Sequence, residues 1–164
     1  MGLLLLRYGE IALKGQNRTY FFRKLRRNVR LCLKANSLPG EVWQEGQRVY
    51  VETERVEEAI EAVRKVFGLV SLSPVHVVAA DMDAVTEEAL AVALREGVNQ
   101  DRSFRVKARR SDKSFPHISP EIERHVGAAI GERTGATVDL SRQADAEIGV
   151  EIQQGRALVY GQII

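Results

Sequence analysis

The sequence is poor in the residues that build disulfides, metal sites and membrane spans. It has one cysteine, Cys32, three histidines and one tryptophan in 164 residues. A single cysteine excludes an intramolecular disulfide and a zinc site made from several cysteines. No apolar run reaches the ~20 residues of a membrane-spanning helix, and Gly2–Leu6 is too short for a secretory leader. We therefore expect a cytoplasmic protein that does not enter a membrane.

Motifs of nucleotide and metal chemistry are also missing. Neither GxxxxGK[ST] nor GxGxxG occurs in the sequence, which removes two common phosphate-binding loops. His117 and His125 are eight residues apart, so they do not form the i, i+4 pair of a helical zinc site. Cys32 falls on an apolar helical stripe, where a structural thiol is expected rather than a nucleophile. We expect no catalytic residue, no metal and no cofactor in this chain.

Positive charge is concentrated in two blocks. The net charge is only +2, yet nine Lys/Arg and one acid lie between Arg7 and Lys34. Six more Lys/Arg and one acid lie between Arg102 and Lys113, while acids gather elsewhere, for example over Glu52–Glu61. Two basic blocks in a nearly neutral chain favour a localised anionic partner, with nucleic acid as the first choice.

An expected strand over Ser103–Arg110 carries the second block. Apolar and basic residues alternate along it from Phe104 to Arg109, so the two kinds of side chain take opposite faces. By itself this pattern fits a polyanion surface and an ordinary solvated strand about equally well. Because Phe104 and several other aromatic rings are expected in the core, the pattern argues against a base-stacking platform. It favours recognition of a structured RNA or DNA through its backbone and shape.

An expected helix over Thr19–Ala35 carries the first block, and Asn17 is its candidate N-cap. Apolar residues recur at helical spacing from Phe21 to Leu33 and form one stripe. The opposite stripe is wholly basic and consists of Arg23, Arg27, Arg30 and Lys34.

The order of expected elements predicts an α+β fold with two domains, over residues 1–75 and 76–164. The first half has the ferredoxin-like (split βαβ) order β-α-β-β-α-β. Its elements are Leu3–Tyr8, the basic helix, Glu41–Gln44, Arg48–Glu52, Val56–Val66 and Val70–Val78. The second half is a smaller α/β unit made of a helix over Ala84–Arg95 capped by Asp83, the basic strand, a helix over Glu121–Arg133, and strands over Val138–Leu140, Ala146–Gln153 and Ala157–Ile164.

Two motifs resemble one enzyme family. Arg7-Tyr8-Gly9-Glu10, followed by Lys14-Gly15-Gln16-Asn17-Arg18, resembles the N-terminus of tRNA 4-thiouridine synthetases, also called tRNA sulfurtransferases. The basic strand and the residues up to Pro116, with Ser119, Glu121, Arg124 and Gly127 after them, resemble the THUMP domain of the same enzymes. The chain departs from that family at Gln143-Ala144-Asp145, where Asn-Pro-Asp is common.

The resemblance implies a role in tRNA thio-modification, which the family combines with sulfur transfer to thiamin biosynthesis. In that family the ferredoxin-like and THUMP domains grip the acceptor stem and the 3′ CCA end of tRNA. A PP-loop domain binds ATP and adenylates the uridine, but its Ser-Gly-Gly-x-Asp-Ser type loop does not occur here. The chain would then be the non-catalytic, tRNA-binding part of such an enzyme. The RNA-binding candidates are Lys14, Arg18, Arg23, Arg27, Arg30, Arg105, Lys107, Arg109, Arg110 and Lys113.

Two other functions stay open. The chain could be a free-standing adapter that docks tRNA or a separate PP-loop catalytic subunit, with acidic Glu52–Glu61 as the docking face. Autonomous sulfur transfer through Cys32 is a weaker alternative. The sequence leaves dimerisation open.

Overall fold

The chain forms two compact units, one over Met1–Val75 with the last two residues of the chain and one over His76–Gln162. The structure is a computed structural model, and it describes residues 2–9, 17–46, 48–141, 143–161 and 164. Within these ranges no helix is long and apolar enough to cross a membrane.

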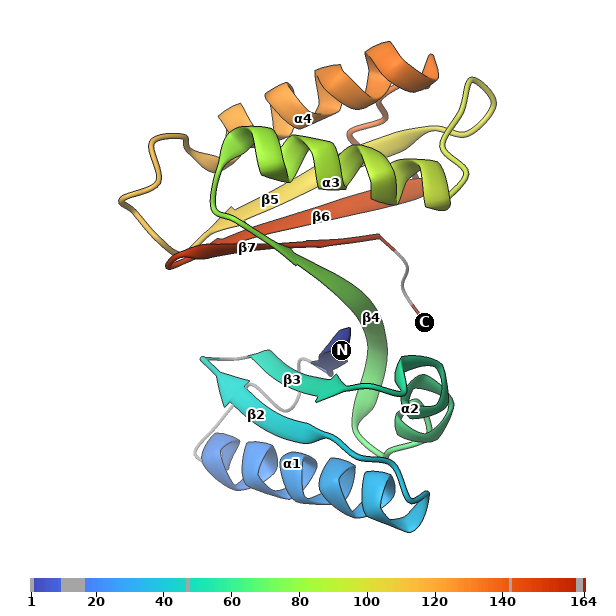
Figure 1. The fold of residues 1–164 in the computed structure, drawn as a ribbon, viewed down its shortest axis with the longest axis vertical. Coiled ribbons are helices and arrows are strands. Elements are labelled where there is room, and N and C mark those ends of the chain that lie inside the picture. The colour runs from blue at the N-terminus through green and yellow to red at the C-terminus, as the bar shows by residue number, and fades with distance from the viewer. Residues whose placement is uncertain (1, 10–16, 47, 142, 162–163) are drawn as a thin grey trace. The chain divides into compact units, whose positions relative to one another are not determined.

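The first unit is a four-stranded antiparallel sheet with two helices, α1 (Arg18–Ala35) and α2 (Val56–Val63), packed on it (Figure 1). Its strands are β1 (Gly2–Tyr8), β2 (Glu41–Glu45), β3 (Arg48–Thr53) and the first part of β4 (Leu69–Val78), in the order β2-β3-β1-β4. This confirms the predicted ferredoxin-like order of elements.

Strand β1 is the centre of this unit because its leucines are buried on both faces. Leu4 and Leu6 point to one face, since side chains alternate along a strand, and they join the apolar stripe of α1 in one core. The buried residues of that stripe are Phe22, Leu25, Val29 and Leu33. The chain end returns to this unit, where Ile164 and Leu72 exchange backbone hydrogen bonds of 2.9 and 3.1 Å.

The second unit is a mixed sheet with α3 (Met82–Arg95) and α4 (Ser119–Thr134) on one face (Figure 1). Its strands are the last part of β4, β5 (Phe104–Arg110), β6 (Ala146–Gln153) and β7 (Arg156–Tyr160), in the order β4-β7-β6-β5. Among the strands described in this unit, β5 and β6 pair in parallel, whereas β4 with β7 and β7 with β6 pair antiparallel. A parallel pair needs a crossover, and α4 supplies it.

Three local predictions for the second unit are corrected. Asp81, not Asp83, caps α3: its carboxylate accepts a 3.2 Å hydrogen bond from the backbone N–H of Ala84, three residues on, as N-cap geometry requires. The strand expected over Val138–Leu140 is reduced to a single bridge between Val138 and Phe104, because this segment exchanges backbone hydrogen bonds with only the first residue of β5. The final strand ends at Tyr160.

Two predictions for the first unit are also corrected. Helix α2 ends at Val63 instead of Val66, and a turn at Gly68 with a φ of 96° leads into β4. Phe67 lies in this turn, beyond the end of the helix, and is 93% exposed. Asn17 takes the N-cap position of α1, but its side chain makes no capping hydrogen bond.

Candidate nucleic-acid interface

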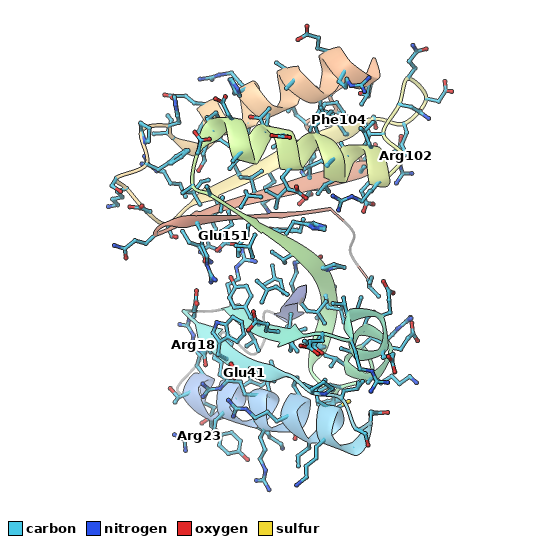
Figure 2. All side chains as sticks on the ribbon, in the orientation of Figure 1. Arg18, Arg23, Glu41, Arg102, Phe104 and Glu151 are labelled. Atoms are coloured by element: carbon cyan, nitrogen blue, oxygen red, sulfur yellow. The ribbon has the colours of Figure 1, made fainter. Side chains whose placement is uncertain are left out.

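Helix α1 presents a basic face in the first unit. Arg23, Arg27, Arg30 and Lys34 are all exposed, at the three- and four-residue spacing that keeps side chains on one side of a helix. The opposite side of α1 is buried against the sheet. The structure thus brings together four of the cations that the sequence predicted, and Figure 2 shows Arg23 extending outward from the helix.

Arg30 is the member of this face with a defined internal partner. One of its terminal nitrogens donates a 2.7 Å hydrogen bond to the backbone carbonyl of Val42. A guanidinium has five N–H donors, so this bond holds the side chain in place and leaves donors for a ligand. Exposed Lys24 adds a cation to α1 that the predicted set lacks, although it was visible in the sequence as part of the basic block.

The two remaining RNA-binding candidates of the first unit are Arg18 and Lys14. Arg18, the first residue of α1, is half-buried and is labelled in Figure 2. Lys14 lies outside the described residues.

Strand β5 has the two faces that its alternation predicted. Phe104 and Val106 are buried in the core of the second unit, between the strands and the helices. Lys107 and Arg109 are exposed, and neither makes an ion pair or hydrogen bond with another described residue. These two cations can therefore meet a polyanion without breaking an internal contact.

Arg105 is on the same face but is already neutralised. The parallel register places Glu147 of β6 opposite it, and the Nε of Arg105 donates a 2.7 Å hydrogen bond to the Glu147 carboxylate. A second guanidinium nitrogen forms an ion pair with the same carboxylate oxygen. Binding of a phosphate to Arg105 would have to compete with this two-point contact.

Arg110 is turned toward its own chain. It is half-buried, and one guanidinium nitrogen donates hydrogen bonds to the backbone carbonyls of Phe115 (2.9 Å) and His117 (3.4 Å). Lys113, in the loop that Arg110 holds, is exposed. Of the five candidates in the second unit, three are available to a ligand and two have internal partners. Sequence spacing could not separate these groups, because the partners lie in other segments.

The aromatic residues follow the predicted pattern only in part. Phe104 and Phe115 are buried, as a core role requires. Tyr20 and Phe67, however, are 65% and 93% exposed, so the first unit does present rings to solvent. Local sequence did not reveal this for Phe67, because its exposure depends on where α2 stops.

Cys32 has the surroundings of a structural thiol. Its Sγ donates a 3.3 Å hydrogen bond to the backbone carbonyl of Ala62 on α2. Burial raises the pKa of the Cys32 thiol, and Lys65 offsets this only in part. A raised pKa keeps the thiol protonated, and the protonated form is a poor nucleophile.

The histidines take dispersed positions. His76 lies beside Arg95 and Glu88, His117 pairs with Glu121, and His125 is exposed on α4. Among the residues that the structure describes, no three His, Cys, Asp or Glu side chains gather as a metal site would require.

The acidic segment has two of its carboxylates paired. Arg55 forms an ion pair with Glu58, and Arg64 with Glu61, within the region of α2. Hydrogen bonding from Arg55 lowers the pKa of Glu58. Of the other acids there, Glu54 and Glu57 are exposed and Glu52 is half-buried.

Comparison with known proteins assigns both units to families. The family model of the ThiI ferredoxin-like domain matches residues 3–73, and the THUMP domain model matches residues 79–161. A probable tRNA sulfurtransferase of Moorella thermoacetica is 40% identical over 163 residues, which are 98% of this chain but 40% of that protein. The chain therefore spans about two fifths of this curated relative.

Two solved structures share the fold across the whole chain. PH1313 from Pyrococcus horikoshii is 36% identical, with a TM-score of 0.88, and the match covers 55% of that protein. A 4-thiouridine synthetase, solved in complex with RNA and ATP, is 26% identical with a TM-score of 0.79, and the match covers 42% of it. With both domains matched in sequence and in fold, the chain belongs to the THUMP-domain proteins and is built as the ferredoxin-like and THUMP region of tRNA sulfurtransferases.

Proposed function

We propose that this chain is the tRNA-binding module of a tRNA 4-thiouridine synthetase and is not itself catalytic. The observation that carries the proposal is the pair of cationic surfaces, the basic face of α1 and the free cations of β5 and its loop. Each stands on a domain of the family that modifies tRNA. The RNA complex of a structurally similar synthetase supports RNA as the partner.

The first surface suits the backbone of a double-stranded stem. Exposed Arg and Lys at helical spacing offer charge to successive phosphates without reading bases. We assign the acceptor stem to Arg23, Arg27, Arg30 and Lys34, with Arg18 and Lys14 as further candidates. Lys24 joins them because it is exposed on the same helix.

The second surface is assigned to the 3′ end and its nearby phosphates. Lys107, Arg109 and Lys113 would make these contacts, since their cationic groups are free of internal partners among the described residues. Arg105 is a secondary candidate because Glu147 already neutralises it. ATP binding, adenylation and sulfur delivery would belong to a PP-loop domain or subunit outside this sequence.

A salt series tests the proposal. If about five phosphates are neutralised, log K should fall with log[salt] with a slope of about −3.5 to −4.5. Affinity for tRNA should then drop about 100- to 500-fold between 50 and 200 mM salt. A DNA duplex of matched length is the control and should bind more weakly. Salt-independent binding, or equal affinity for the DNA duplex, would refute the proposal.

The adapter function predicts a different result. A separate catalytic subunit would be retained by the chain after nuclease treatment, and substitutions of Glu54 and Glu57 would weaken that contact. Since Glu58 and Glu61 are engaged by neighbouring arginines, the acidic segment offers less free charge than the basic face of α1. We therefore place RNA binding first.

A further inference from the structure

The loop between β5 and α4, over Ser111–Ile118, is held by its own hydrogen bonds. Ser111 donates from both its backbone N–H and its hydroxyl to the carbonyl of Ile152, each at 2.9 Å. The carboxylate of Asp112 accepts from the N–H (3.0 Å) and the hydroxyl (2.7 Å) of Ser114. These bonds fix the first half of the loop against the end of β6 and into a tight turn.

The second half of the loop is fixed by packing and by Arg110. The ring of Phe115 is buried in the core of the second unit. Arg110, the last residue of β5, donates from one nitrogen to the carbonyls of Phe115 and His117 at 2.9 and 3.4 Å. The side chain therefore ties the end of the strand to the far side of the loop.

This arrangement leaves one cation at the free part of the loop. Lys113 lies between the Asp112 turn and the buried Phe115 ring, and it is exposed. Its neighbours in the chain, Asp112 and Ser114, are hydrogen-bonded to each other. The position of the Lys113 Cα is therefore set before any ligand binds. A preformed loop reduces the entropy lost on binding.

We propose that Arg110 is a positioning residue: it holds the Ser111–Ile118 loop in the form that presents Lys113 to RNA and does not itself contact a phosphate. This inference rests on the proposed function. It also reassigns Arg110, which sequence charge alone places among the RNA ligands. Lys107 and Arg109 remain direct contacts beside the loop.

The test separates positioning from direct contact by the salt slope. Arg110→Met removes the donors and keeps the length of the side chain, whereas Arg110→Lys keeps a donor and a charge. Lys113→Met is the matched control for loss of one direct phosphate contact. Binding of each variant to tRNA is measured from 50 to 200 mM salt, and backbone amide exchange of the loop is measured without RNA.

We expect Arg110→Met to weaken tRNA binding about tenfold, the effect of losing a charge-assisted hydrogen bond, with the salt slope unchanged. The amides of Ser114 and Phe115 should exchange faster in this variant, and Arg110→Lys should restore most of both properties. Lys113→Met should instead reduce the magnitude of the slope by about 0.7–0.9 and leave the amide exchange unchanged.

Two outcomes would overturn the inference. A slope that Arg110→Met reduces further in a chain already carrying Lys113→Met would make Arg110 a phosphate ligand. Unchanged amide exchange in Arg110→Met would show that the loop does not depend on this side chain. If the unsubstituted chain fails to bind tRNA, the proposed function fails, and the exchange measurement still decides whether Arg110 holds the loop.

Discussion

Neutralising the basic face of α1 should weaken tRNA binding by an amount that charge alone can predict. The perturbation is the double substitution Arg23→Gln and Arg27→Gln. Both side chains are exposed, and neither forms an ion pair or hydrogen bond with another described residue. Their removal should leave the free energy of unfolding within about 0.5 kcal/mol of the original value, as for most surface substitutions.

The expected magnitude follows from counterion release. Each phosphate contact contributes about 0.7–0.9 to the slope of log K against log[salt]. Loss of two contacts should therefore reduce the slope by about 1.4–1.8. If the binding constant extrapolated to 1 M salt is unchanged, affinity at 0.15 M salt falls about 15- to 30-fold.

A matched control removes two positive charges from the residues that cap the two ends of α2. Arg55→Gln with Arg64→Gln also deletes two guanidinium groups, but these are engaged by Glu58 and Glu61. Fluorescence anisotropy with labelled tRNA at four salt concentrations measures both pairs. We expect the control to stay within about twofold of the original affinity, because these two guanidinium groups are already paired with carboxylates and do not belong to the basic face of α1. Equal losses in the two pairs would refute the reasoning, since binding would then follow net charge and not the face of α1.

Three further predictions address the fold and the remaining candidates. A Cβ at Gly149 would clash with the ring of Tyr160, so Gly149→Ala should lower the free energy of unfolding in urea by about 1–3 kcal/mol, and by much less when Tyr160→Ala is also present. Burial, and then the charge of Arg95, lower the pKa of His76 below its ordinary 6.5. As the pH falls, His76 is therefore protonated in the unfolded chain before it is protonated in the folded chain. The free energy of unfolding should decrease as the pH drops below about 6.5. His76→Asn should lack this loss, and parallel pH curves for the two proteins would contradict the assignment. Cys32→Ser keeps a donor toward the Ala62 carbonyl and should leave tRNA binding unchanged, whereas a loss of binding would reopen a functional role for the thiol.

Local patterns predict the elements well where one physical signal dominates. Alternation along β5 correctly places Phe104 and Val106 inside, because a strand sends successive side chains to opposite faces. Helical spacing correctly separates the buried and basic stripes of α1. Element ends are less well predicted: α2 stops before Phe67, and the cap of α3 is Asp81. Both depend on backbone geometry at single residues, which residue type constrains only weakly.

The sequence by itself determined the two domains, their order of elements and the two basic blocks, because hydrophobic periodicity and local charge are properties of neighbouring residues. Only the tertiary structure decided which cations are free. Arg105 meets Glu147 because β5 and β6 pair in parallel, although the two residues are 42 positions apart in the sequence. Arg110 meets Phe115 and His117 because the following loop turns back over the strand end. A hydrogen bond depends on distances of a few ångströms between segments, and strand register and loop path set those distances.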